Sequence, residues 1–140
     1  MKDSLVIILT LMTVLASCVK ENTPVIPLDN TVDTTIAMPK NKGDFMNGPF
    51  GSVSGMVTVY KQNGSLILSL ENMMISNGPQ LYVYLSKEVQ PVNFIDLGAL
   101  QSIKGNQLYP IPGNPDFSQY QYALIHCKKY NHLFGSARLQ

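Results

Sequence analysis

The sequence contains little charge and no tryptophan. Charged residues make up 14% of its 140 residues, and the formal net charge is +1. A nucleic-acid-binding surface needs Lys and Arg concentrated against the phosphate backbone, so we expect no nucleic-acid partner. Hydrophobic residues make up 45% of the chain, which is enough for a folded core and too many for disorder throughout. The length allows one domain.

Motifs that specify familiar catalytic machinery are missing as well. The chain has no G-x-S-x-G elbow, no C-x-x-C pair, no G-x-G-x-x-G turn and no P-loop. Glu71 and Asp96 are isolated carboxylates, so paired acid–base chemistry is not supported. We therefore expect no enzyme of a familiar class, and a redox module remains open.

The one long apolar run lies at the N-terminus. Leu5 to Ala16 is uncharged and follows the basic Lys2. The run is too short for a transmembrane helix, which needs ~20 residues, and it has the length of a signal-peptide h-region. It ends in "LASC" (15–18), which resembles the lipobox of bacterial lipoproteins. This resemblance implies cleavage before Cys18 and acylation of Cys18; the alternative is an ordinary signal peptide with an incidental cysteine.

The lipoprotein interpretation predicts a protein anchored by lipid in the bacterial cell envelope, with residues 1–17 removed as the signal peptide. Val19 follows Cys18 where an Asp retention signal would stand, so we expect the outer membrane. Residues 18–44 are rich in Thr, Asn and Pro and show no sustained hydrophobic period. This composition predicts a flexible, lipidated tether that holds a domain away from the membrane.

From Phe45 onward, apolar and polar residues alternate with the period of a β-strand. Asn63-Gly64 is a strong hairpin signal between two such runs, and Asn77 to Pro79 is another turn signal. The runs are "SVSGMVTVY", "LILSLEN", "LYVYLS", "FIDLGAL", "GNQLYPIP", "QYALIHC" and "HLFGSARL". Short strands at this spacing predict an all-β fold for residues 45–140, either a sandwich or a barrel.

Cys127 ends the run "QYALIHC". In a strand it shares a face with Ala123 and Ile125, whereas His126 points to the opposite face. If Cys18 carries lipid, Cys127 has no intramolecular partner. An unpaired cysteine in an exported protein is a free thiol, an intermolecular disulfide or a ligand.

Two interpretations of Cys127 stay open. On an apolar face it is a small core residue, because free cysteine is among the most often buried residue types. As a functional thiol it is followed directly by Lys128, whose positive charge favours the reactive thiolate. His132, on the next predicted strand, is the expected neighbour of Cys127, ahead of His126, which points to the other face. Cys and His also suit copper or haem iron, although a metal site needs further ligands.

Four phrases occur in order along the chain: "SGMVTVY", "LSLENMMISNGPQLYVYLS", "IDLGALQSIKGNQLYPIP" and "YALIHCKKYNHLFGSARL". Together they closely resemble the DM-thirteen domain, a family also labelled the electron-transfer domain, over roughly Phe45 to Leu139. The resemblance implies that residues 45–140 form one small, jelly-roll-like β-sandwich, with Cys127 at the family's characteristic cysteine. For that cysteine, redox chemistry as a thiol or as a ligand to a cofactor such as haem has been proposed. This chain has His126 where the family often has Trp.

The function expected on these grounds is redox chemistry or electron transfer in the envelope, centred on Cys127, with a redox partner protein. The alternative is a binding or adhesion module without chemistry, in which Cys127 belongs to the core and the loops recognise a ligand.

Overall fold

The computed structural model describes residues 22–140. The expected signal peptide and Cys18 lie outside these described residues. Residues 22–140 contain no helix that could serve as a membrane span, and their regular structure consists of β-strands. The strands are β1 (Leu28–Asp29), β2 (Met38–Asn47), β3 (Val53–Gln62), β4 (Ser65–Ile75), β5 (Leu81–Ser86), β6 (Phe94–Ala99), β7 (Lys104–Ile111), β8 (Tyr122–Cys127) and β9 (His132–Arg138).

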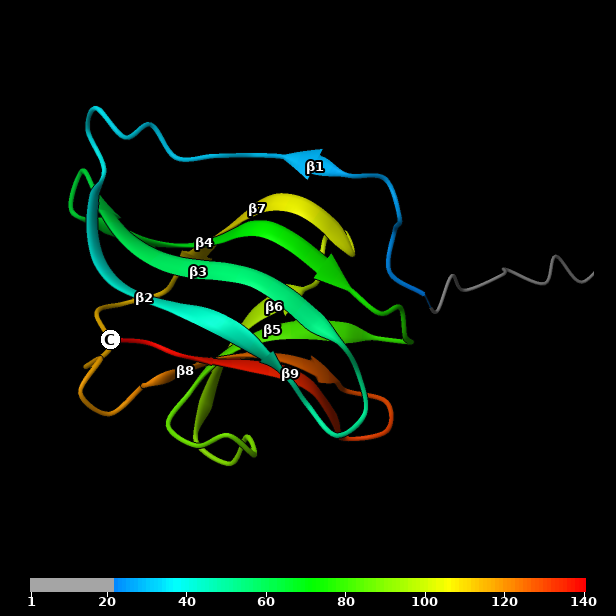
Figure 1. Ribbon diagram of the computed structural model, residues 1–140. Coiled ribbons are helices and arrows are strands. Elements are labelled where there is room, and N and C mark those ends of the chain that lie inside the picture. Colours follow the sequence, from blue (N-terminus) through cyan, green and yellow to red (C-terminus); the bar gives the residue numbers. More distant parts are fainter. Residues whose placement is uncertain (1–21) are drawn as a thin grey trace, which may run out of the picture.

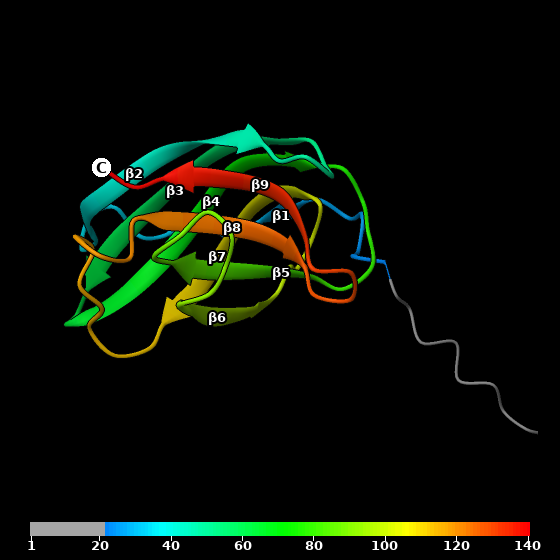
Figure 2. The ribbon, with the colours of Figure 1, turned by 90° about the horizontal axis from the view of Figure 1, so that it is seen from below.

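The nine strands form one curled sheet in the order β1-β7-β4-β3-β2-β9-β8-β5-β6 (Figure 1). The sheet folds over on itself, so that β6 comes close to β7 without pairing with it (Figure 2). The all-β prediction is confirmed, and the domain is a small β-sandwich-like unit. Its two layers are the two halves of a single sheet.

Strand β2 connects the two halves. Met38 to Asp44 pair with β3, and Phe45 to Asn47 pair with β9. At Gly43 the strand passes so close to β9 that an added Cβ would collide with the Arg138 carbonyl. The crossing therefore needs a residue without a side chain, and Phe45, two residues further on, turns its ring into the core.

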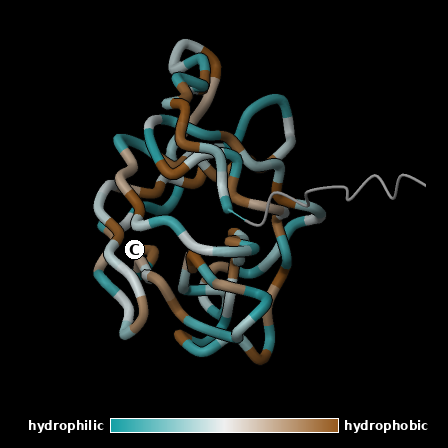
Figure 3. The backbone as a smooth tube through the Cα atoms, turned by 90° about the vertical axis from the view of Figure 1, so that its right-hand side faces the viewer, coloured by the Kyte–Doolittle hydropathy of each residue, from teal (hydrophilic) through white to brown (hydrophobic). Residues whose placement is uncertain are grey.

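Side chains alternate along the strands as the sequence predicts, and hydrophobic and hydrophilic residues follow one another along the tube in Figure 3. Burial of each large aliphatic side chain contributes roughly 1.5–3 kcal/mol. The β3–β4 turn is also as predicted, because Asn63 and Gly64 both have positive φ (50° and 81°), as a type I′ hairpin requires. The fully buried large aliphatic residues are Val57, Val59, Leu68, Leu70, Leu81, Val83, Leu85, Leu124 and Ile125.

The predicted tether is wrong where the structure describes it. Met38 to Asp44 belong to β2, and Leu28–Asp29 pair in parallel with β7. Hydrophobic periodicity does not reveal β2, because only Phe45 of its ten residues is buried. Backbone hydrogen bonds to two neighbouring strands hold it in place instead, and these are insensitive to side-chain type.

We predict that a chain beginning at Asn22 unfolds cooperatively, whereas a chain beginning at Phe45 shows no cooperative transition. The shorter chain lacks the part of β2 that pairs with β3, so β3 becomes an open edge and the two halves of the sheet separate. Thermal unfolding followed by circular dichroism measures this. Equal midpoints for the two chains would contradict the structural role assigned to β2.

Candidate functional site

Cys127 is the last residue of β8 and pairs in register with Leu81 on β5 and His132 on β9. Its side chain points into the core beside Ala123 and Ile125, as the alternation predicts, and is 1% exposed. It is the free cysteine of the described residues. The site is therefore a thiol that is buried but stands at the very end of a strand.

The loop between β4 and β5 covers this strand end. The Cys127 thiol donates a hydrogen bond to the Pro79 carbonyl oxygen, 3.1 Å from Sγ, and the Lys128 amide donates to the Gln80 carbonyl, 2.9 Å away. Gly78 lies so close to the Phe134 ring that an added Cβ would come within 2.6 Å of it. We call Asn77 to Gln80 the cover loop.

The first described residues fasten the cover loop from outside. The Thr23 amide donates to the Asn77 side-chain oxygen (3.1 Å), and the Asn77 side-chain amide donates back to the Thr23 carbonyl (3.0 Å). Asn22 forms an isolated β-bridge with Pro79. Sequence analysis identified "NGP" as a turn but gave no sign of this clasp, because the two segments lie 54 residues apart.

His126 lies on the face opposite Cys127, as predicted. It is 2% exposed, its Nε2 lies 2.9 Å from the Asn131 side-chain oxygen, and its Nδ1 is buried without a hydrogen-bond partner. Burial lowers the pKa of His126 below the ordinary 6.5, although the Asn131 hydrogen bond opposes this. The ring is therefore neutral at physiological pH.

His132 and Lys128 turn to other partners. The His132 ring stacks on Phe50, with centroids 3.7 Å apart. The Lys128 ammonium lies 4.6 Å from the Tyr82 ring centroid and 3.6 Å from a carboxylate oxygen of Asp96. Of the predicted neighbours, only His132 is placed beside Cys127 by strand register.

An aromatic cluster on the outer face of β5 is a feature that sequence analysis missed. Tyr84 stacks on Phe94 with centroids 4.3 Å apart and lies 5.5 Å from the His126 ring. Burial, followed by the Asp96 charge, raises the pKa of Tyr84 to about 12. The alternation of Tyr82 and Tyr84 with core residues pointed to this face, but the contribution of Phe94 depends on β5–β6 pairing.

The described residues around Cys127 do not fit a copper or haem-iron site. Residues 22–140 contain no group of three or more His, Cys, Asp and Glu able to hold a metal ion. His126 and Cys127 face opposite sides of the strand, and the thiol already donates to Pro79. We therefore derive no chemistry through a metal or a haem.

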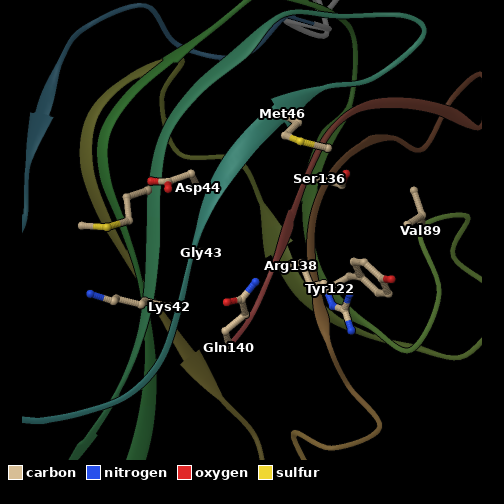
Figure 4. Close-up of a pocket in the computed structure, with 10 residues that line it drawn as sticks. Lys42, Gly43, Asp44, Met46, Val89, Tyr122, Ser136, Arg138 and Gln140 are labelled. Carbon is tan, nitrogen blue, oxygen red and sulfur yellow. The ribbon is translucent and has the colours of Figure 1, made fainter.

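A separate open groove of about 640 Å³ runs along the outer face of β2, β9 and β8 (Figure 4). Met46, Val89 and Tyr122 give it an apolar lining, and Lys42 and Arg138 add positive charge beside Asp44. Cys127 is not among the residues that line it.

These features define the class of protein: a small β-sandwich-like domain with a buried cysteine at the end of a strand. The sequence model of the family described as Electron transfer DM13 matches residues 45–139, so the chain belongs to that family. No curated protein and no solved structure matches the chain. The family match begins seven residues inside β2, and the β1 segment precedes it.

We predict that the free energy of unfolding decreases as pH falls below about 6.5. The unfolded chain then takes up a proton on His126, whereas the folded chain does not until pH reaches its lowered pKa. The loss is at most about 1.4 kcal/mol per pH unit between these two pKa values and ends below the lower one. Urea unfolding between pH about 8 and about 5 measures it.

The substitution His126→Gln should remove most of this pH dependence, because glutamine does not titrate. His132→Gln is the control: it removes a partly exposed imidazole on the neighbouring strand, and because His132 is only the smallest of the causes that shift the His126 pKa, most of the slope should remain. If His126→Gln leaves the slope unchanged, the buried imidazole is not its source.

Proposed function

We propose that this protein is an electron-transfer module of the bacterial cell envelope, with the Cys127 thiol as its redox-active group. The family's description supports the redox role. We assign the redox role to Cys127 because of its position: it lies at the end of a strand, and its thiol donates a hydrogen bond to the cover loop. Displacing this loop is the shortest route by which a partner reaches the sulfur.

The reaction that suits a lone thiol is exchange with the disulfide of a partner protein or small molecule. The Cys127 thiol loses its proton to solvent, and the thiolate attacks one sulfur of the partner's disulfide. A new S–S bond forms as the old one breaks, and the second sulfur leaves as a thiolate. Cys127 is thereby oxidised and the leaving sulfur reduced, and a thiol of the partner reverses the step.

Access to the sulfur then depends on the cover loop. The hydrogen bonds from Cys127 to Pro79 and from Lys128 to Gln80 must break before a disulfide can approach. The clasp between Thr23 and Asn77 opposes this opening from outside. In the folded protein, the rate at which Cys127 reacts therefore depends on how often the cover loop opens.

We predict that Cys127 in a Cys18→Ser chain reacts with a small aromatic disulfide much more slowly when folded than in urea. Gly78→Ala should speed the folded reaction about 10-fold to 100-fold. The added methyl overpacks against Phe134, such overpacking costs about 1–3 kcal/mol, and about 1.4 kcal/mol corresponds to a factor of ten. Release of the coloured thiolate gives the rate.

Gly113→Ala is the control for this experiment. Gly113 has a positive φ (69°), and an added Cβ there meets no atom within 4 Å, so this substitution strains the backbone away from the cover loop without overpacking a neighbour. Equal acceleration by the two substitutions would show that global unfolding exposes the thiol. No reaction of folded Gly78→Ala would remove thiol exchange from the proposed function.

The same proposal includes lipid anchoring through Cys18, with the outer membrane as its site. The lipobox-like "LASC" and the absence of Asp after Cys18 support it. Several acyl chains at ~0.8 kcal/mol per buried methylene hold a protein stably in a bilayer.

For the anchor, we predict that the full chain expressed in a bacterium fractionates with the membrane, with a mass that includes acyl chains on Cys18. Cys18→Ser should lose both the acyl mass and the membrane association. An unmodified Cys18, or a Cys18→Ser protein that stays on the membrane, would rule out the lipid anchor.

A second candidate function is a binding or adhesion module without redox chemistry. The observation that favours it is the membership of Cys127 in the main core cluster, at 1% exposure. In that case the open groove along β2 and β9 is the surface that recognises a ligand. The two candidates separate in the thiol-exchange experiment, because a binding module has no use for a cover loop that opens.

A further inference from the structure

The distance between the expected anchor and the folded domain is short. Asn22, the first described residue, follows Cys18 by four positions. A fully extended chain advances at most ~3.6 Å per residue, so Asn22 stands within roughly 15 Å of the lipidated residue. This step rests on the proposed acylation of Cys18.

From Asn22 onward the chain is fixed to the domain. Asn22 and Thr23 bond to the cover loop, and the Pro24 carbonyl accepts from the Ile103 amide (3.0 Å). The Ile26 carbonyl accepts from the hydroxyl of Ser102 (2.6 Å), which is fully buried. Residues 22–26 are held against the domain by these hydrogen bonds, so the position of the anchor determines which end of the domain faces the membrane.

That end is formed by four segments: residues 22–26 and the loops 48–52, 76–80 and 128–132. Backbone hydrogen bonds join them, since Gly48 and Phe50 donate to the start of β9 and Ser76 donates to Ser52. Figure 1 shows the β2–β3, β4–β5 and β8–β9 loops together on the right, opposite the C-terminus, and Figure 3 looks onto this end. We call it the loop end.

The loop end has the chemistry of a membrane-contacting surface. Its four segments contain no Asp or Glu and carry Lys128 and Lys129. The Lys128 ammonium pairs with Asp96 on β6, and the Lys129 ammonium lies 5.5 Å from the Tyr130 ring centroid. Tyrosines and lysines of this kind favour the headgroup region and anionic lipids. The exposed apolar side chains are Val25 (58%), Ile26 (73%), Phe50 (54%) and Tyr130 (56%).

We propose that the loop end rests on an anionic lipid surface, with Phe50, Tyr130 and Ile26 in the headgroup region and Lys128 and Lys129 against lipid phosphates. The cover loop belongs to this surface. A partner that reaches Cys127 therefore does so at the membrane. The segment before β1, which contacts lipid in this arrangement, also hydrogen-bonds to the loop that shields the thiol.

Tryptophan fluorescence tests the proposal, because the chain has no tryptophan of its own. The acylated full chain with Phe50→Trp is reconstituted into vesicles of phosphatidylglycerol and brominated phosphatidylcholine. Met38→Trp is the control, since Met38 is also apolar, is more exposed than Phe50 (70% against 54%) and pairs with Lys61 at the opposite end of the sheet. We expect loss of most of the Phe50→Trp fluorescence to bromine quenching and little change for Met38→Trp.

Charge reversal of Lys128 and Lys129 to Glu in the Phe50→Trp chain should restore fluorescence on these anionic vesicles. Tyr130→Trp repeats the measurement if Phe50→Trp does not fold. Equal quenching at the two ends, or none at either, would overturn the proposal. The proposal would also be overturned if Phe50→Trp were protected from a water-soluble quencher only when a copurified protein is bound, because a protein and not lipid would then cover the loop end.

Mass spectrometry of the same sample tests the acylation of Cys18 separately from the membrane contact of the loop end. If Cys18 is acylated and Phe50→Trp is not quenched, the membrane-contacting surface fails and the lipid anchor stands. If Cys18 is unmodified, the anchor fails and the proposed orientation fails with it. The thiol-exchange reaction of Cys127 is measured independently of both.

Discussion

The pairing of β2 with both β3 and β9 is the interaction on which the rest of the structure depends. It makes one sheet of two layers, and it places Phe45 between them. The close passage at Gly43 is possible because that residue has no side chain. Since β4 belongs to one half of the sheet and β5 to the other, the loop between them spans the end of the core. The shielding of Cys127 is thus a consequence of how the halves are joined.

The cover loop connects features that are far apart in the sequence. It accepts the Cys127 hydrogen bond from inside, and it is clasped by Thr23 from outside. The segment that holds it, Asn22 and Thr23, begins four residues after Cys18 in the sequence. A family profile that begins at Phe45 does not include this N-terminal contribution.

Strand geometry separates groups that are neighbours in the sequence. Cys127 turns into the core, and His126 joins Tyr84 and Phe94 on the outer face. The neutral, buried imidazole and the phenol with its raised pKa share an environment that penalises charge. The thiol shares its strand end with the cover loop. The Cys127 sulfur and the His126 imidazole therefore lie on opposite faces of β8 and have different neighbours.

The all-β class, the Asn63-Gly64 hairpin and the opposite facing of His126 and Cys127 could be predicted from the amino-acid sequence. Each follows from local alternation or from the backbone preferences of two residues, and such information is contained in a short stretch of chain. Three features became visible only in the folded chain: Met38 to Asp44 form a strand, Pro79 accepts the thiol hydrogen bond, and Thr23 exchanges two hydrogen bonds with Asn77. These contacts join backbone and polar groups of distant segments, and neither hydrophobic period nor motif spacing records which segments will meet.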